Sequence, residues 1–227
     1  MSFFECNLHA IPEGSDSASR LAFAAKRLGY DGIVISNHSC FIDIFRPRAA
    51  FKVNSIDVDF GIEIVGNNPK ALGNWISKMR AKYAFIAIHG GSEDINRAAC
   101  EHPDVDVLLH PEKGRRVLSI AAARAAEHNQ VAVGFDLSPL IRLRGITRAR
   151  RLELIKRNII LARKFNLQIM ITTGARSRFD LRTPQELRAL AEIAGFESSE
   201  IETALNLPGK ILELNKRIWL GTGVELL

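Results

Sequence analysis

The sequence predicts an α/β protein folded as a distorted TIM-like barrel of about seven βα units. Three observations predict it: short apolar runs alternate with helix-compatible segments along the 227 residues, most runs are almost continuously apolar, and polar side chains follow nearly every run. Continuous Val, Ile, Leu and Phe is typical of parallel strands buried on both faces. The even spacing favours a closed barrel over an open sheet, and without any linker composition we expect one domain, residues 1–227.

The order of elements follows from the apolar runs and from helix-capping residues. We expect seven strands, at Phe3–Leu8, Gly32–Asn37, Asp59–Val65, Ala84–His89, Val105–His110, Val131–Leu137 and Gln168–Thr173. Helices are expected between them, at Ser15–Leu28, Pro69–Lys82, Ser92–His102, Val117–His128 and Thr147–Phe165, with Ser15, Ser92 and Thr147 as N-caps. Pro47 interrupts the helix-compatible segment Ser39–Lys52. Beyond the last strand we expect helices at Thr183–Ala194, Ser198–Asn206 and Leu207–Trp219, the first of them capped by Thr183 with Pro184 at its first helical position.

The composition favours a protein of the reducing cytoplasm. The three cysteines, Cys6, Cys40 and Cys100, are far apart and form no CxxC pair, which argues against both a disulfide framework and a cysteine zinc site. No apolar stretch is long enough to cross a bilayer, and the first residues lack a basic segment followed by an apolar run. We therefore expect a cytoplasmic chain without a membrane partner.

Positive charge is concentrated between Arg142 and Arg182. This segment holds twelve Lys or Arg against two carboxylates, Glu153 and Asp180, a net charge of +10, whereas the whole chain carries +6. Most of these cations are arginines, whose planar guanidinium suits phosphate. Since each neutralised phosphate releases a counterion, such a region predicts a polyanion partner. The alternative is a solvated helix face.

A barrel would bring the arginine-bearing loops to one rim. The candidate RNA contacts flank the helix at 147–165 and follow the next strand: Arg142, Arg144, Arg148, Arg176, Arg178 and Arg182. Asp180 is expected either to orient Arg178 or Arg182 or to bond within its own loop. A solvated face is the favoured interpretation for Arg150, Arg157 and Lys164, and Arg115 and Arg116 are weaker RNA candidates.

Histidines recur at the ends of the predicted strands. His9, His38, His89 and His110 lie at or just past strand ends, and Glu63 and Asp136 lie near two others. In a barrel these ends share one mouth, where imidazoles and carboxylates could bind Zn²⁺ or Mn²⁺ and activate water. The alternative is that they bond only to nearby loops.

The N-terminal half resembles the PHP (polymerase and histidinol phosphatase) fold, a distorted seven-unit βα barrel with up to three metals. The resemblance rests on NLHAIPEGSDSASRLAFAAKRLGYDGIVISNH, followed by GIEI and LLHP. It implies metal-ligand positions at His9, His38, Glu63, His89 and His110. Several ligands are replaced, however: Ile11 stands for the second histidine of the first pair, Asn7 and Asn37 for acids, and residues 172–175 for a late Asp-x-His. A vestigial, weak one-metal site for zinc or manganese is therefore expected.

The second half resembles the ribonuclease P protein component 3 family, the archaeal counterpart of the thirty-kilodalton eukaryotic subunit. The matching features are the GF-x-L-x-PL turn at 134–140, the Arg148–Ala149 pair, the T-[ST]-x-A strand end and the D-x-R-x-P segment at 180–184. Members have a PHP-like barrel. The resemblance implies a subunit that binds the catalytic RNA and precursor tRNA, beside a smaller ferredoxin-like subunit and other subunits.

In such an enzyme the RNA removes the 5′ leader of precursor tRNA with Mg²⁺, and the chain itself is expected to be non-catalytic, with no cofactor of its own beyond the weak metal site. Two alternatives stay open. The first is a PHP-type metal-dependent phosphoesterase that uses His9, His38, Glu63, His89 and His110. The second is an interaction module whose tail, Leu207–Leu227, docks on a protein, although such a tail is more often used to close its own barrel.

Overall fold

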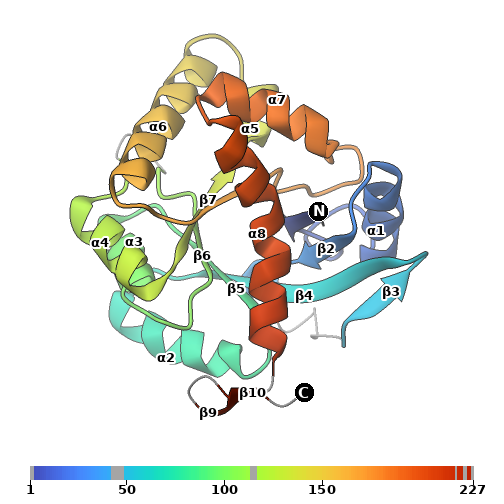
Figure 1. The fold of residues 1–227 in the computed structure, drawn as a ribbon, viewed down its shortest axis with the longest axis horizontal. Coiled ribbons are helices and arrows are strands. Elements are labelled where there is room, and N and C mark those ends of the chain that lie inside the picture. The colour runs from blue at the N-terminus through green and yellow to red at the C-terminus, as the bar shows by residue number, and fades with distance from the viewer. Residues whose placement is uncertain (1–2, 42–48, 113–116, 218, 222–223, 226–227) are drawn as a thin grey trace.

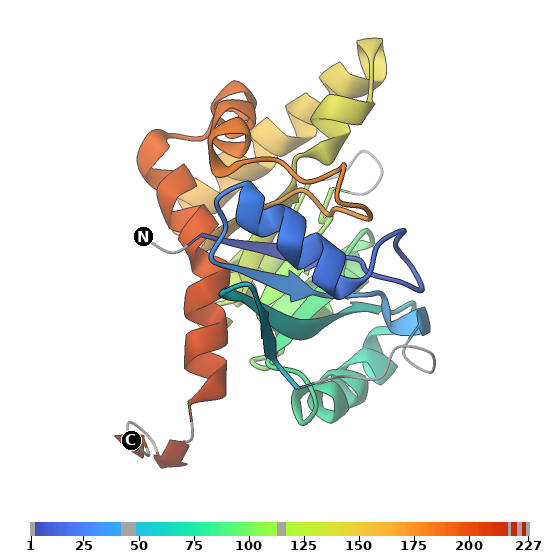
Figure 2. The ribbon, with the colours of Figure 1, turned by 90° about the vertical axis from the view of Figure 1, so that its right-hand side faces the viewer.

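Seven parallel strands, curled into a nearly closed barrel, form the centre of the protein (Figures 1 and 2). The computed structural model describes residues 3–41, 49–112, 117–217, 219–221 and 224–225. Helices surround the barrel, and one further helix lies across an end of it (Figure 2). The predicted α/β barrel is therefore confirmed.

The strands follow one another around the barrel in chain order, and each pairs with its neighbour in parallel. They are β1 (Phe4–Leu8), β2 (Gly32–Ile35), β4 (Ile56–Val65), β5 (Phe85–His89), β6 (Val107–Leu109), β7 (Ala132–Asp136) and β8 (Ile169–Thr172). All seven predicted strands are confirmed, with ends that differ by a few residues. Short connections of βα type explain this order, because each helix returns the chain to the start of the next strand.

The segment Ser39–Lys52, which Pro47 interrupts, is not a regular helix in its described residues. It has a 3₁₀ turn, η1 (Ser39–Phe41), and leads into a strand, β3 (Phe51–Val53), that pairs antiparallel with β4 and was not predicted. Residues 42–48, with Pro47, lie outside the described residues. β3 is only partly buried at the edge of the sheet. Its sequence therefore lacks the continuous apolar run by which the buried strands are predicted.

The outer helices are α1 (Ala18–Arg27), α2 (Pro69–Arg80), α3 (Glu93–Cys100), α4 (Ile120–Asn129), α6 (Gly145–Lys164) and α7 (Pro184–Ala194). The Ser92 and Thr183 caps are confirmed, and Thr183 forms a capping box with Glu186. Two other caps were wrong: Ser17 rather than Ser15 caps α1, and α6 begins at Gly145, before Thr147. The short helix α5 (Ser138–Arg142) was not predicted. None of the helices in the described ranges is long and apolar enough to span a bilayer.

A single long helix, α8 (Ser198–Lys216), replaces the two predicted at its position. Pro208 lies inside it, although an interior proline costs about 3 kcal/mol in a helix. Burial outweighs that cost, since Leu207, Ile211 and Leu212 pack against the side chains inside the barrel, among them Cys6 and Phe85. The helix crosses the barrel where the strands begin (Figure 2). As far as Lys216, the tail therefore closes its own barrel.

After α8 the described residues form two short antiparallel strands, β9 (Trp219–Gly221) and β10 (Val224–Glu225). The helix predicted to continue to Trp219 therefore ends at Lys216. Ile218, one of the apolar residues of the tail in the docking alternative, lies outside the described residues.

The barrel closes between β8 and β1 through side chains rather than a strand ladder. The carboxylate of Glu5 accepts hydrogen bonds from the backbone N–H of Thr173 (2.8 Å) and from the hydroxyls of Thr172 (2.9 Å) and Thr173 (3.0 Å). The Thr172 hydroxyl also lies 2.5 Å from the Cys6 carbonyl oxygen. Just above, His9 N–H donates to the Ala175 carbonyl (2.9 Å). These bonds form a seam that joins the two ends of the sheet.

Burial raises the pKa of Glu5 to about 7, although the hydrogen bonds from Thr173, Thr172 and Tyr30 act in the opposite direction. The Tyr30 hydroxyl lies 3.1 Å from Glu5 Oε2 and 2.8 Å from the Arg182 carbonyl. A protonated Glu5 can donate to that hydroxyl, which then donates to Arg182. The neutral acid therefore satisfies the seam better than the carboxylate does.

Replacement of Glu5 by glutamine should stabilise the protein above neutral pH. An acid whose pKa is higher in the folded state binds more protons folded than unfolded, so its contribution to stability is lost as pH rises between about 4.5 and 7. The Glu5→Gln amide can donate to Tyr30 at every pH. We expect equal free energies of unfolding at pH 5 and a gain for Glu5→Gln of up to about 3 kcal/mol at pH 8. Urea unfolding of both proteins at each pH tests this, and a parent that gains on the variant with rising pH would contradict it.

Candidate functional site

A bulge in β1 turns His9 into the mouth of the barrel. Between Glu5 and Leu8 the register with β2 shifts, because Glu5 pairs with Ile33 and Leu8 with Ile35. β1 therefore advances by one residue more than β2 between these two pairs. Asn7 lies at this slip with a φ of 57°, a left-handed conformation that asparagine tolerates. Cys6 faces the barrel interior, whereas Leu8 packs outside against α1 and β2. Because the alternation has shifted by one residue, His9 faces inward.

The other histidines point into the mouth for two reasons: regular alternation along their strands, or a second residue with a left-handed backbone. Val34 on β2 and Phe85 and Ala87 on β5 face inward, which places His38 and His89 on the same side as each strand ends. His110 follows β6 with a φ of 51°, so its ring also turns toward the cluster. Glu63, near the end of β4, is fully buried. The barrel thus gathers all five predicted residues.

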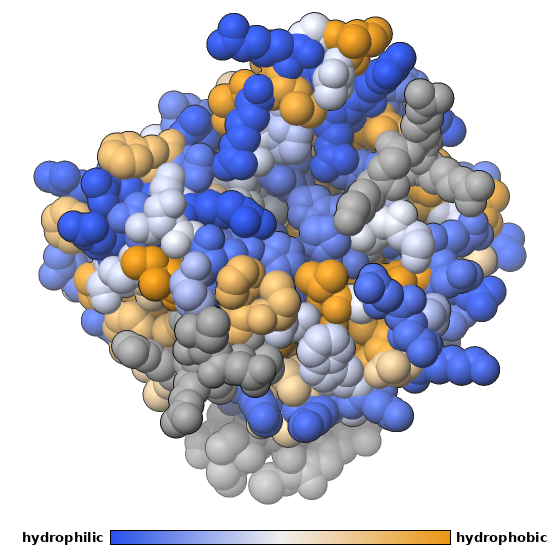
Figure 3. Space-filling model, turned by 180° about the vertical axis from the view of Figure 1, so that it is seen from behind, coloured by the Kyte–Doolittle hydropathy of each residue, from blue (hydrophilic) through white to orange (hydrophobic). Residues whose placement is uncertain are grey.

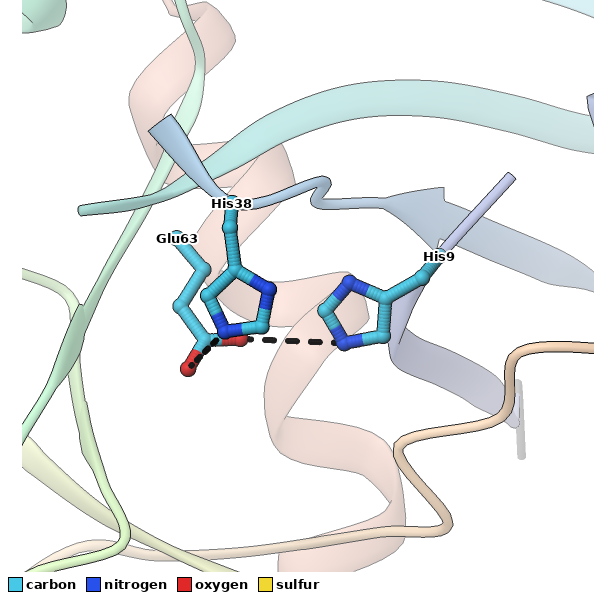
Figure 4. A group of neighbouring side chains, drawn as sticks. All are labelled: His9, His38 and Glu63. Atoms are coloured by element: carbon cyan, nitrogen blue, oxygen red, sulfur yellow. Dashed lines mark ion pairs between the residues drawn. The ribbon is translucent and has the colours of Figure 1, made fainter. Parts of the chain in front are cut away.

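The imidazoles of His9 and His38 lie beside the carboxylate of Glu63 (Figure 4), and those of His89 and His110 complete the group. Glu63 Oε1 lies 2.5 Å from His89 Nδ1 and 3.4 Å from His38 Nε2, and Oε2 lies 3.7 Å from His9 Nε2. The rings of His9 and His38 are stacked with centroids 4.9 Å apart, and those of His89 and His110 are 4.8 Å apart. We call these five residues the histidine cluster.

Sequence reasoning missed a sixth participant, Glu13. Its Oε1 lies 2.5 Å from His38 Nδ1, and its Oε2 accepts the His38 backbone N–H (2.8 Å) and lies 3.2 Å from His9 Nδ1. Glu13 is four residues after His9 and falls within the quoted N-terminal run, but it follows a strand end only through a loop. The fold of that loop, and not a strand-end pattern, brings it to the histidines.

Opposite charges set the protonation of the cluster. Burial lowers the pKa of His38, but its hydrogen bonds to Glu13 and Glu63 outweigh burial and raise the pKa to about 10. Burial likewise opposes ionisation of Glu63, yet the hydrogen bonds from His38 and His89 hold its pKa well below the usual range. Burial lowers the pKa of His110 to about 4. An imidazolium at His38 therefore lies between two carboxylates.

The residues that depart from the PHP pattern have other roles here. Asn37 clamps the loop after β1, because its side-chain oxygen accepts Ala10 N–H (2.8 Å) and its amide donates to the Ala10 carbonyl (2.9 Å). Ile11 is 55% exposed, and Thr172 and Thr173 belong to the seam. Asp136 accepts a hydrogen bond from Ser138 N–H (2.8 Å). It is in neither of the two groups of described side chains that are spaced to hold a metal ion, both of which include Glu63. Among the replaced positions, Asn37, Thr172 and Thr173 thus hold the structure of the mouth together.

Three of the predicted RNA contacts pair with carboxylates. Arg176 Nη2 lies 3.1 Å from Glu13 Oε1, Arg178 Nη1 donates to Asp16 (2.8 Å), and Arg142 Nη2 lies 3.0 Å from Asp180. The Arg142–Asp180 pair joins the end of α5 to the loop after β8, so the two arginine-bearing segments are adjacent. We call Arg142, Arg144, Arg148, Arg176, Arg178 and Arg182 the arginine rim.

The remaining rim arginines differ in how they are held. Arg182 donates to the carbonyls of Phe179 (2.9 Å) and Leu181 (2.6 Å), and Arg148 to that of Leu143 (2.7 Å). Arg144 is exposed, and within the described ranges its side chain has no hydrogen bond or ion pair. It lies between α5 and α6 in the chain, and these helices project beyond the barrel (Figure 2). The Arg142–Asp180 pair brings the end of α5 to the loop after β8, whereas RNA contact by the rim stays a prediction.

Two further expectations for the basic region are resolved. Asp180 does not orient Arg178 or Arg182: it accepts bonds from Arg176 N–H (3.2 Å) and the Ser177 hydroxyl (2.9 Å), which is the loop-bonding alternative, and pairs with Arg142. On α6, Ile155, Ile159 and Ala162 are buried, while Arg150, Arg157 and Lys164 are exposed, as the helical spacing predicts. Arg115 and Arg116 lie outside the described residues.

Viewed from the side opposite α8, most of the surface is hydrophilic, with separate apolar patches (Figure 3). The exposed apolar side chains include Ile146, near the start of α6, and Phe179, in the loop after β8. The Arg178 guanidinium lies 4.6 Å from the centroid of the Phe179 ring. In the loop after β8 an arginine therefore lies beside an exposed apolar ring.

Gly14 is required where the loop after β1 meets the loop after β8. A Cβ at this position would lie 1.9 Å from the His9 carbonyl oxygen and 2.7 Å from that of Arg176, both backbone atoms. We therefore expect Gly14→Ala to lower the free energy of unfolding by about 1–3 kcal/mol. Urea unfolding measures this. Gly73→Ala in α2 is the control, since its nearest neighbour would lie at 3.6 Å, and it should keep or raise stability. Equal unfolding midpoints for the two variants would contradict the role of Gly14.

Comparison with known proteins identifies the family. The family model described as RNase P subunit p30 matches residues 2–219. The chain belongs to the RNase P subunit p30 family. Ribonuclease P protein component 3 of Methanosarcina barkeri is 38% identical over 216 residues, 94% of this chain and 90% of that relative. The component 3 of Methanothermobacter thermautotrophicus is 36% identical over 237 residues, 100% of this chain and 96% of that relative.

Solved structures agree with the family assignment. A chain in the cryo-EM structure of archaeal ribonuclease P with mature tRNA is 26% identical, with a TM-score of 0.76 over 93% of this chain and 90% of that one. Histidinol phosphate phosphatase of Lactococcus lactis, complexed with zinc, has a TM-score of 0.54 at 12% identity, over 86% of this chain and 95% of that one. That second likeness shows the fold alone, and it agrees with the PHP-like barrel expected for the p30 family.

Proposed function

We propose that this chain is a protein subunit of ribonuclease P, which supports RNA-catalysed removal of the 5′ leader from precursor tRNA by binding the RNA. The observation that carries the proposal is the match over nearly the whole chain to component 3 proteins and to a chain of an archaeal ribonuclease P that holds mature tRNA. On this proposal catalysis belongs to the RNA with its Mg²⁺, and the chain contributes to the enzyme without being catalytic.

The arginine rim is the surface proposed to bind RNA. Asp16 and Glu13 are almost completely buried, and they hold Arg178 and Arg176 in fixed directions. An arginine already positioned by a carboxylate loses less side-chain entropy when it meets a phosphate. Both arginines stay partly exposed, with 39% and 51% of their side chains accessible. The carboxylates therefore leave guanidinium N–H groups that can contact phosphates.

The rim favours folded RNA over single strands. Phe179 is the one exposed aromatic residue in the described loop after β8, which carries three of the rim arginines. The Arg178 guanidinium already covers one face of its ring. Proteins that bind single strands stack successive bases on several aromatic rings. Recognition through phosphates and shape suits structured RNA such as ribonuclease P RNA and tRNA.

The proposed partners follow the family. They are the ribonuclease P RNA, precursor tRNA, a smaller subunit of ferredoxin-like fold and the other protein subunits. A cytoplasmic location is proposed with them, on the basis of the reduced, unpaired cysteines among the described residues.

The alternative of a PHP-type phosphoesterase has weaker support. The histidine cluster offers ligands, but the similarity to the phosphatase is 12% and extends to the fold only. The two relatives described above match over nearly the whole chain, and both are ribonuclease P components. We therefore propose that the RNA, and not this chain, catalyses the reaction of the assembly.

The exposed arginines at the start of α6 provide the sharpest test of RNA binding. Arg144→Gln/Arg148→Gln removes two positive charges, and only the Arg148 side chain has a bond within the described fold. We expect a weaker affinity for ribonuclease P RNA, by about tenfold, and a slope of log affinity against log salt that is less steep by about 2. Filter binding at several salt concentrations measures both.

The control is Lys70→Gln/Lys78→Gln, with the same charge change on exposed residues of α2. α2 and the α5–α6 corner occupy opposite sides of the barrel (Figure 1). This double variant should bind RNA as the parent does. Equal losses in both double variants would show that net charge, and not the arginine rim, sets the affinity.

Reconstitution tests the function of the assembly. Adding the chain together with its small partner to ribonuclease P RNA should lower the Mg²⁺ concentration needed for precursor-tRNA cleavage, because protein cations take over part of the phosphate neutralisation. Arg178→Gln/Arg182→Gln should raise that Mg²⁺ requirement again. Cleavage assays across a Mg²⁺ series measure the shift, and an unchanged requirement with the parent chain would overturn the proposed function.

A further inference from the structure

Phe179 is exposed at the tip of a loop whose other parts are held by hydrogen bonds. The residue is 75% exposed. A single exposed apolar side chain is common on protein surfaces and needs no explanation by itself. The surroundings of Phe179 distinguish it, because both the backbone that carries the ring and the arginine that covers one of its faces are fixed.

The loop after β8 folds into a tight turn around Phe179. Asp180 N–H donates to the Ser177 carbonyl (3.1 Å), the bond that closes a β-turn with Arg178 and Phe179 at its centre. The Asp180 carboxylate also accepts the Ser177 hydroxyl (2.9 Å), and Arg182 donates to the Phe179 carbonyl (2.9 Å). The fold of the loop therefore sets the place of the ring without any packing of the ring itself.

Arg178 covers one face of the Phe179 ring. Its guanidinium carbon lies 4.6 Å from the ring centroid, within the range of a cation–π interaction. Asp16, which is buried, accepts hydrogen bonds from both the backbone N–H (2.9 Å) and the Nη1 (2.8 Å) of Arg178. The guanidinium is thereby fixed on its own side of the ring. Because the residue is 75% exposed, the other face of the ring is open to a planar partner.

The ring also lies among cations. Arg176 belongs to the same loop, and Arg142 reaches this loop through its ion pair with Asp180 (3.0 Å). The side chains of these two arginines are 51% and 48% exposed. A polyanion that carries planar aromatic groups matches both the charges and the ring, and RNA has this chemistry. A protein would match both only by placing acidic side chains beside an apolar one.

One exposed ring suits one base. Proteins that bind long single strands stack successive bases on several aromatic side chains, whereas the described loop after β8 exposes a single aromatic residue. Folded RNA offers isolated unpaired bases in its loops, bulges and ends, and such bases stack on aromatic side chains. A single stacked base is therefore compatible with a rim that recognises structured RNA.

We propose that Phe179 is the stacking site for one unpaired nucleotide of a folded RNA. The base lies on the open face of the ring, opposite Arg178, and the neighbouring phosphates meet Arg142 and Arg176. This inference rests on the proposed function, because it names the part of the RNA that the arginine rim recognises. Phosphate contacts carry no sequence information, whereas a stacked base requires an unpaired nucleotide at this place. Phe179 therefore fixes the position of the RNA on the rim.

The first experiment compares Phe179→Leu with Phe179→Trp in the full-length chain. Filter binding to ribonuclease P RNA at several salt concentrations should show an affinity about tenfold weaker for Phe179→Leu. The slope of log affinity against log salt should not change, because a stacked base releases no counterion. Phe179→Trp should keep the parental affinity, since it keeps an aromatic face. Parental affinity in Phe179→Leu, or an equal loss in Phe179→Trp, would overturn the stacking site.

Phe23→Leu is the matched control. Phe23 on α1 is 46% exposed and also has an arginine over its ring, with the Arg27 guanidinium carbon 5.1 Å from the centroid. Arg27 has no carboxylate partner among the described residues, so it is not fixed as Arg178 is. Phe23→Leu should bind RNA as the parent does. Equal losses in the two leucine variants would overturn a specific role of Phe179, and urea unfolding checks that both variants are as stable as the parent.

Chemical probing of the bound RNA identifies the nucleotide. Acylation of 2′-hydroxyls reports flexible nucleotides, and cleavage by hydroxyl radicals reports exposed backbone. At saturating protein, the parent should protect an unpaired nucleotide from acylation. Phe179→Leu should restore its reactivity while the backbone stays protected from radicals. A footprint in which no nucleotide depends on Phe179 would overturn the stacking site even if the affinity falls.

The outcomes separate this inference from the proposed function. A parent chain that does not bind ribonuclease P RNA would contradict the proposed function itself. A parent that binds and leaves a footprint, with Phe179→Leu changing neither, would remove the stacking site alone. Unchanged RNA binding together with weaker binding of the small protein subunit by Phe179→Leu would assign the ring to a protein contact, and would likewise overturn the inference.

Discussion

The seam between β8 and β1 is the constraint on which the rest of the structure depends. No strand ladder joins these two edges, and the buried carboxyl group of Glu5 links them instead through Thr172 and Thr173. Closure brings residues 9–16 against residues 175–182, although they are far apart in the chain. Glu13 and Asp16 lie on one side of this contact, and the arginines that they hold, Arg176 and Arg178, lie on the other. An open sheet would separate these ion pairs.

Acidic residues give this basic face its order. Glu13, Asp16 and Asp180 each hold an arginine of the rim, and Glu13 contacts His9 and His38 as well. A face of arginines alone would repel itself and leave its long side chains mobile. The carboxylates reduce both costs and still leave the guanidinium groups partly exposed. The arrangement explains how a chain with a net charge of only +6 can present a directed cationic surface.

Glu13 also connects the two parts of the mouth. One of its oxygens lies between His38 and Arg176, so the geometry of the cluster and that of the rim are set together. The bulge at Asn7 has a similar effect, because it turns His9 inward while Leu8 remains in the outer core. Small irregularities in one strand and one loop therefore decide what the whole mouth presents to solvent.

The sequence by itself determined the alternation of buried parallel strands and helices, because continuous apolar runs are typical of strands that helices cover on both faces. It also determined which histidines and arginines gather at strand ends. Tertiary structure alone decided the role of Glu13 and Asp16, the direction of His9 and the partner of Asp180, since these depend on contacts between segments distant in sequence. The same holds for α8, where packing on the barrel overrides the local effect of Pro208. Local patterns encode elements, and only closure of the chain on itself fixes which charges meet.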